Sequence, residues 1–173
     1  LWGCHFAGLV YTAASSRLTS AELTYIINDC GAKAFITSKY KSDQAMEIAD
    51  AIANVRMRLM LDGTVPGYES YESAVEQQEA TPLSDRVAGF DMLYSSGTTG
   101  LPKGITKPFL AQPLDSTPTS VAPTLGMLFG FTQDSVYLSP APMYHAAPLR
   151  FTMAAQSIGS TAVVMEHFLS LIH

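Results

Sequence analysis

Apolar residues recur at helical spacing near the start of the chain and predict a helix with one buried face. The residues on that face are Leu23, Ile26, Ile27 and Cys30. Thr19 and Glu22 precede them with the spacing of a capping box, in which each residue caps the other at the first turn. Gly31 directly follows the last apolar position, where a glycine commonly ends a helix. The pattern therefore predicts both ends of this helix.

A second amphipathic helix is predicted to open at Ser42, because apolar residues again repeat at helical spacing. Its predicted buried face consists of Ala45, Ile48, Ala49 and Ile52. Each of the two helices is followed by a short apolar run typical of a strand, AKAFITS at residues 32–38 and RMRLMLD at residues 56–62. This alternation of helix and strand is typical of βαβ units with a parallel sheet.

The second half of the chain continues the alternation. Further strands are predicted at residues 90–94, 135–140 and 160–166, and further helices at residues 70–78, near Leu125 and at residues 148–159, where Gly159 ends the helix. The segment 106–123 is rich in Pro, Ser and Thr and predicts a long loop. We therefore expect a single α/β unit over residues 1–173, with a mostly parallel sheet flanked by helices.

Composition narrows the class of protein. A hydrophobic content of 47% with 14% charged residues is typical of a globular protein and argues against disorder. The net charge of −5 gives no support to a nucleic-acid partner. Cys4 and Cys30 are too few for a disulfide framework, lack metal-ligand spacing and are expected in the core. Without a recognisable signal peptide or an apolar run of about 18 residues, we expect no transmembrane segment and a cytoplasmic location.

The connector after the predicted strand 90–94 has an unusual composition. It reads YSSGTTGLPKG, with hydroxyls on Ser95, Ser96, Thr98 and Thr99, glycines at Gly97, Gly100 and Gly104, and the cation of Lys103. Backbone N–H groups beside glycines can approach a phosphate closely, hydroxyls add donors, and threonine oxygens can ligate Mg²⁺. The pattern is neither a Walker A loop nor a Rossmann glycine fingerprint. From the residues alone, a polyphosphate cradle and a plain surface loop both stay open.

The run SSGTTGLPKG resembles the signature loop of the adenylate-forming superfamily, which contains acyl-CoA synthetases, adenylation domains of peptide synthetases and luciferases. Two further segments are similar to regions of acyl-CoA synthetases, residues 7–38 and the run APMYHAAPL at residues 141–149. The resemblance implies part of the large N-terminal domain of an acyl-CoA synthetase-like fold. Both ends of the chain look cut, so we expect a fragment that lacks the C-terminal domain.

The resemblance also implies a reaction, its co-substrates and a set of site residues. ATP activates a carboxylic acid, expected to be a fatty acid, as an acyl-adenylate, and coenzyme A then takes the acyl group. The residues expected to bind the ATP phosphates are Ser95, Ser96, Gly97, Thr98, Thr99, Gly100, Lys103 and Gly104. The resemblance assigns catalytic roles to Lys103, Thr98 and His145. It also implies that Thr98 coordinates Mg²⁺ together with a downstream Glu that this chain lacks. Tyr144 and His145 are expected to line the acyl pocket.

Several alternatives stay open. Within the superfamily they are an aryl-CoA ligase and a peptide-synthetase adenylation domain, and outside it a phosphotransferase or a non-catalytic interaction module. The expected partners are small molecules, namely ATP, fatty acid and coenzyme A, and a homodimer stays open. His5, His167 and His173 are expected to be bystanders. Arg150 is expected near the same pocket, as a surface or packing residue that needs no function. Because the partners of ribose and adenine are missing, we expect the chain alone to be inactive.

Overall fold

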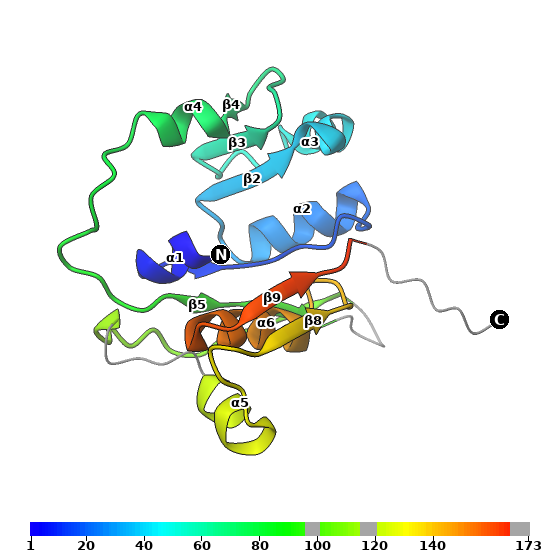
Figure 1. Ribbon diagram of the computed structural model, residues 1–173. Coiled ribbons are helices and arrows are strands. Elements are labelled where there is room, and N and C mark those ends of the chain that lie inside the picture. Colours follow the sequence, from blue (N-terminus) through cyan, green and yellow to red (C-terminus); the bar gives the residue numbers. More distant parts are fainter. Residues whose placement is uncertain (96–100, 115–120, 167–173) are drawn as a thin grey trace. The chain divides into compact units, whose positions relative to one another are not determined.

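The computed structural model describes residues 1–95, 101–114 and 121–166 (Figure 1). The chain divides into two compact units, each built from separate stretches of sequence. Unit 1 contains Leu1–Ala13, Ser84–Leu93 and Thr106–His173, and unit 2 contains Ala14–Leu83 and Tyr94–Ile105. The expectation that residues 1–173 form one α/β unit within a larger domain stays a prediction.

The first predicted helix is present in unit 2 as α2 (Ser20–Asp29). The hydroxyl oxygen of Thr19 accepts a hydrogen bond from the Glu22 N–H at 3.3 Å, and the Glu22 carboxylate accepts one from the Thr19 N–H at 2.8 Å. Both halves of the predicted capping box are therefore formed, and two backbone donors that the helix leaves unpaired are satisfied.

The end of α2 is set by Gly31, as predicted. Its φ of +64° lies in the left-handed region, which costs a residue with a Cβ atom energy but not glycine. The Gly31 N–H donates to the Asn28 carbonyl and the Ala32 N–H donates to the Ile27 carbonyl, both at 3.1 Å. This pair of bonds is a Schellman motif, and it turns the chain directly into the next strand.

Unit 2 contains a parallel three-stranded sheet in which β3 lies between β2 and β4 (Figure 1). Its elements are β2 (Ala34–Ser38), the 3-10 helix η1 (Lys39–Lys41), α3 (Ser42–Ile48), β3 (Met57–Leu61), β4 (Glu69–Ser70) and α4 (Tyr71–Glu76). The strands predicted at residues 32–38 and 56–62 and the helix predicted at residues 70–78 are thereby confirmed. The helix α3 is shorter than predicted, and the last predicted core position, Ile52, is fully buried in the turns that follow it.

Two apolar clusters hold unit 2 together. The first joins α2, α3 and the turns after α3 through Leu23, Ile27, Ile48, Ile52 and Val55. The second contains Ala45, Met60 and Tyr68, and the Tyr68 hydroxyl donates to the Ala45 carbonyl at 2.9 Å. That hydrogen bond satisfies the polar end of a side chain whose ring is otherwise buried.

Unit 1 repeats the parallel pattern. Its elements are α1 (Trp2–Phe6), β1 (Val10–Tyr11), β5 (Phe90–Asp91), α5 (Ala122–Phe129), β8 (Val136–Ser139), α6 (Ala146–Ile158) and β9 (Thr161–Val164). The strand β1 pairs in parallel with β5, and β8 pairs in parallel with β9. The helix α6 connects β8 to β9 and ends at Gly159 with a φ of +92°, as predicted. The predicted α/β class, with parallel strands and flanking helices, is confirmed.

The strand predicted at residues 90–94 is divided in two. Its first part is β5, which pairs with β1, and its second part is β6 (Leu93–Ser95), which pairs with β7 (Lys103–Ile105). The prediction of one continuous strand was wrong because the two halves bind different partners. The connector is also shorter than predicted, since Ser95 and Lys103 already belong to strands.

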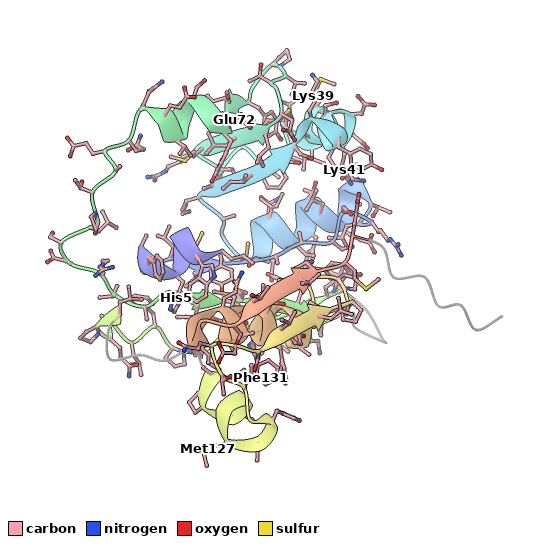
Figure 2. All side chains as sticks on the ribbon, in the orientation of Figure 1. His5, Lys39, Lys41, Glu72, Met127 and Phe131 are labelled. Carbon is pink, nitrogen blue, oxygen red and sulfur yellow. The ribbon has the colours of Figure 1, made fainter. Side chains whose placement is uncertain are left out.

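The short helix α1 was not predicted, and contacts far along the chain hold it. His5, which Figure 2 labels on α1, is buried. Its Nδ1 lies 2.6 Å from the Gly89 carbonyl oxygen. The Gly89 N–H donates to the His5 carbonyl at 2.8 Å. A Cβ atom at Gly89 would overlap the carbonyl oxygens of Cys4 and Leu9, so only glycine fits this close approach.

Candidate functional site

The predicted phosphate loop is described only at its two ends. Ser95 is the last residue of β6, and Lys103 and Gly104 open β7. The remaining predicted phosphate ligands lie outside the described residues, namely Ser96, Gly97, Thr98, Thr99 and Gly100. The predicted role of Thr98 in holding Mg²⁺ therefore stays a prediction.

The two ends of the loop lie side by side. β6 and β7 are hydrogen-bonded neighbours, and the Ser95 hydroxyl donates to the Lys103 carbonyl at 3.5 Å. The Lys103 side chain is exposed, and no carboxylate in the described part of the chain forms an ion pair with it. The two ends of the connector are therefore held together by the pairing of β6 with β7.

Tyr94 ties the strand before the loop to α2. Its hydroxyl donates to Asp29 Oδ2 at 2.6 Å, within unit 2. Burial, followed by the hydrogen bond to Asp29, raises the pKa of Tyr94 well above its ordinary value. The phenol therefore stays protonated as a donor, and it ties β6 to the last residue of α2.

The predicted aromatic-His pair lies at the start of α6. His145 is the N-cap residue of that helix, and its carbonyl accepts the Leu149 N–H at 3.2 Å. The rings of Tyr144 and His145 lie 4.3 Å apart between centroids, with 43° between their planes. The His145 side chain is exposed and makes no capping hydrogen bond to the helix. Its imidazole therefore stands beside the first turn of α6, where it can meet a ligand.

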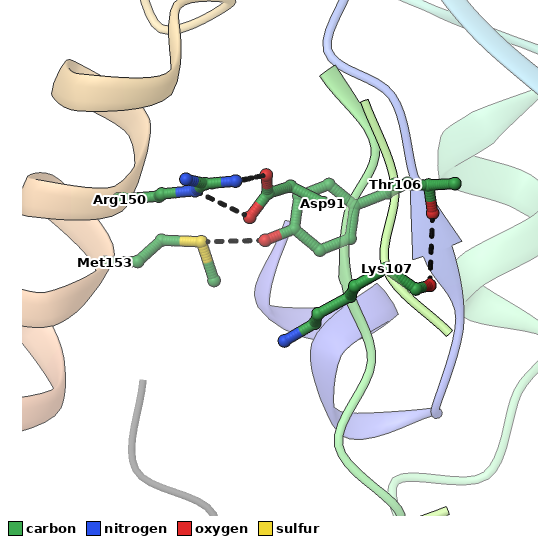
Figure 3. Close-up of polar contacts among 6 residues, drawn as sticks. Asp91, Thr106, Lys107, Arg150 and Met153 are labelled. Atoms are coloured by element: carbon green, nitrogen blue, oxygen red, sulfur yellow. Dashed lines mark hydrogen bonds and ion pairs between the residues drawn. The ribbon is translucent and has the colours of Figure 1, made fainter. Parts of the chain in front are cut away.

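Sequence reasoning missed an ion pair in the same unit. Arg150 on α6 donates to Asp91 on β5 from Nη2 at 2.7 Å and from Nε at 3.2 Å (Figure 3). The Asp91 side chain is 13% exposed and the Arg150 side chain 42%. The hydrogen bond to Asp91 raises the pKa of Arg150 above its ordinary value. The signal in the sequence was a carboxylate inside the apolar run FDMLY, because a buried carboxylate needs a partner.

A second contact lies next to this ion pair. The Tyr11 hydroxyl on β1 donates to the Met153 sulfur on α6 at 3.1 Å (Figure 3). Burial first, and then the negative charge of Asp91, raises the pKa of Tyr11 to about 12. Tyr11, Asp91, Arg150 and Met153 thus form a half-buried group of polar atoms between two strands and a helix.

The predicted site residues fall in different units. The loop ends belong to unit 2 and the Tyr144–His145 pair to unit 1, so their meeting at one site stays a prediction. Among the described residues, no three His, Cys, Asp or Glu side chains gather in a way that could hold a metal ion. In the same part of the chain, every helix is too short or too polar to cross a membrane.

Comparisons with known proteins agree with the α/β fold. The family model of the AMP-binding enzymes matches residues 1–172. The chain is 28% identical to a 4-hydroxybenzoate--CoA/benzoate--CoA ligase of Rhodopseudomonas palustris, over 94% of this chain and 30% of the relative. It is 28% identical to a long-chain-fatty-acid--CoA ligase of Thermus thermophilus, over 91% of this chain and 28% of the relative.

A solved structure shows the same fold. ATP-bound MatB from Rhodopseudomonas palustris matches with a TM-score of 0.66 and 26% identity, over 94% of this chain and 31% of that chain. The chain thus spans about a third of the length of the curated relatives it matches. With a family model that covers almost every residue, the chain belongs to the AMP-binding enzyme family.

Proposed function

We propose that the protein activates a carboxylic acid with ATP and transfers the acyl group to coenzyme A. The observation that carries the proposal is the SSGTTGLPKG run, whose ends are joined by the β6–β7 pairing and whose Lys103 is exposed without an acidic partner in the described residues. The family match supports the nucleotide, and both curated relatives are named as CoA ligases.

The first half-reaction is nucleophilic substitution at phosphorus. A carboxylate oxygen of the substrate attacks the α-phosphorus of ATP, the bond to the bridging oxygen breaks, and pyrophosphate leaves. Negative charge grows on the leaving group, so preorganised donors and a cation lower the barrier. We assign the cation to Lys103 and the donors to the loop hydroxyls and amides between Ser95 and Gly104. Bound through Thr98, Mg²⁺ would neutralise further phosphate charge.

The second half-reaction occurs at the acyl carbon. The sulfur of coenzyme A attacks that carbon, AMP leaves with the electron pair of the broken bond, and the thiol proton is released. We assign Tyr144 and His145 to the carboxylate side, because the exposed imidazole at the start of α6 can touch the reacting group.

The proposal includes a cytoplasmic location and a place in the N-terminal domain of a longer enzyme, and a homodimer stays a prediction.

We propose a fatty acid as the substrate. Similarity to a long-chain-fatty-acid--CoA ligase favours it, and similarity to a benzoate--CoA ligase at the same identity makes an aromatic acid the second candidate. Pyrophosphate exchange into ATP by the complete gene product, with fatty acids of several lengths, benzoates and amino acids offered in parallel, separates these classes. Thioester formation with coenzyme A then separates a CoA ligase from a peptide-synthetase adenylation domain.

Lys103→Ala tests the assigned cation. We expect it to slow pyrophosphate exchange by about 10²–10³-fold, the usual effect of removing one group that stabilises transition-state charge. Lys33→Ala is the matched control, because Lys33 is an exposed lysine of the same unit outside the loop. Exchange that fails with every acid, or ADP as the product with a hydroxyl acceptor, would overturn the proposal. An unchanged rate in Lys103→Ala would overturn the role of that residue.

A further inference from the structure

One face of α6 contacts the other elements of unit 1 through three side chains spaced three residues apart. They are Arg150, Met153 and Gln156. Their respective partners are Asp91 on β5, Tyr11 on β1 and Trp2 on α1, at 2.7, 3.1 and 2.7 Å. All six residues belong to unit 1. These contacts form a polar ladder along the helix, a name kept below for the three pairs.

The same face also carries apolar contacts. Leu149 is fully buried and packs in one cluster with Tyr11, Leu93 and Met153. Apolar burial is non-directional, so it holds α6 against the strands without strongly fixing how far the helix slides along its axis. Hydrogen bonds weaken steeply when their distance or angle changes. The polar ladder therefore adds directional contacts that resist sliding of α6 along its axis.

Within the ladder, the Asp91–Arg150 pair stands nearest the start of α6. Arg150 follows the N-cap residue His145 by five positions, about 7.5 Å along a helix that rises about 1.5 Å per residue. The other two pairs lie further from that end. Arg150 also engages Asp91 through two nitrogens, Nε and Nη2, as Figure 3 shows. A planar fork held at two points fixes orientation as well as distance.

We propose that Asp91 and Arg150 are positioning residues for His145, holding the start of α6 so that the imidazole meets the substrate carboxylate. This inference rests on the proposed function. Neither residue touches a substrate in this role. Misplacing a reacting group by about 1 Å can cost about 10²-fold in rate. Substitutions in the pair should therefore change kcat and KM for the carboxylic acid and leave ATP binding unchanged.

The first test is kinetic and uses the complete gene product in the adenylation half-reaction. In Arg150→Met we expect kcat to fall and KM for the acid to rise, with a combined loss of about 10–100-fold in kcat/KM, while KM for ATP stays within about twofold. Arg150→Lys keeps the charge but loses the fork, so its values should lie between those of wild type and Arg150→Met. Asp91→Asn should act in the same direction. Arg56→Met is the matched control, an exposed arginine in unit 2.

The pair should also behave as one unit. The double variant Asp91→Asn/Arg150→Met should lose little more than Arg150→Met alone, because the second change removes a contact already broken. Losses that multiply would overturn the proposal. A fall in kcat with both KM values unchanged would also overturn it, since that pattern reports less folded enzyme. An unchanged KM for the acid would do the same.

Hydrogen exchange tests the inference separately from the proposed function. Amide hydrogens in residues 146–158 should exchange faster in Arg150→Met than in wild type or Arg56→Met. The increase in rate should be largest near Leu149. Equal amide exchange rates in the three proteins would show that the pair does not fix α6, even if every kinetic result agreed with the proposal. If the wild-type protein catalyses pyrophosphate exchange with none of the acids offered, only the proposed function is refuted. The hydrogen-exchange data would still decide whether the pair fixes the helix.

Discussion

The Tyr94 hydroxyl donates a 2.6 Å hydrogen bond to Asp29, the last residue of α2. A carboxylate at this end of a helix faces the negative end of the helix dipole, and the phenol compensates for that repulsion. We expect Tyr94→Phe to lower the free energy of unfolding by about 1 kcal/mol, because a partly exposed hydrogen bond to a charged group is lost. Asp29→Asn keeps an acceptor and removes the repelled charge, so its loss should be smaller. Urea denaturation measures both, and a larger loss in Asp29→Asn would contradict this account.

Two glycines with open space around them should respond oppositely to alanine. At Gly31, a Cβ atom would meet nothing within 4 Å, but φ is +64°. Gly31→Ala should therefore destabilise by about 1–2 kcal/mol through backbone strain alone. Gly126 lies inside α5 with equally open surroundings, so Gly126→Ala should stabilise by about 0.5–1 kcal/mol. Chemical denaturation should give opposite signs, and equal signs would refute the backbone argument.

The capping box at α2 should make stability depend on pH. The backbone hydrogen bond from Thr19 and then its side chain lower the pKa of Glu22 below its ordinary value of 4.5. A pKa lower in the folded than in the unfolded state gives stability that is present above pH 4.5 and lost as pH falls through the folded value. Thermal midpoints at pH 7 should be lower in Glu22→Gln than in wild type, and the gap should close below pH 4.5. A gap that stays constant with pH would contradict this assignment.

Leu149 and Leu128 form a matched pair for testing the core of unit 1. Leu149 is fully buried against Tyr11 and Met153, whereas Leu128 on α5 is 71% exposed. Leu149→Ala should lower the free energy of unfolding by about 2–5 kcal/mol, because it removes apolar contacts and leaves a cavity. Leu128→Ala should stay within about 0.5 kcal/mol. Urea midpoints measure both, and similar losses would mean that the cluster around Leu149 collapses to fill the space.

The features that could be predicted from the sequence are those set by near neighbours. The capping box at Thr19 and the helix ends at Gly31 and Gly159 each depend on residues within one or two turns, and all three predictions are confirmed. The break between β5 and β6 was missed, because it depends on which strand each half meets. A strand as short as Val10–Tyr11 carries no alternation to recognise.

The candidate site divides along the same line. Motif similarity indicated Lys103 and His145, and the structure places them at the start of β7 and the start of α6. The Asp91–Arg150 pair escaped notice because its members stand 59 residues apart, and only folding makes them neighbours. The roles of the loop residues from Ser96 to Gly100 stay predictions, since those residues lie outside the described ranges.

The division of unit 1 into separate stretches has a consequence for synthesis on the ribosome. The contacts of Leu1–Ala13 reach far along the chain, and Trp2 meets Gln156 across 154 residues. The β2–β4 sheet can form as soon as Leu83 has emerged, whereas Trp2 must wait for Gln156, about 4–15 s later at about 5–20 residues per second. Until Gln156 emerges, Trp2 lacks its partner on α6, although β1 can pair with β5 as soon as Asp91 has emerged. We expect chaperones to bind the apolar residues of Leu1–Ala13 during this interval. We also expect the speed of translation between Leu83 and Gln156 to set how much of the protein folds correctly.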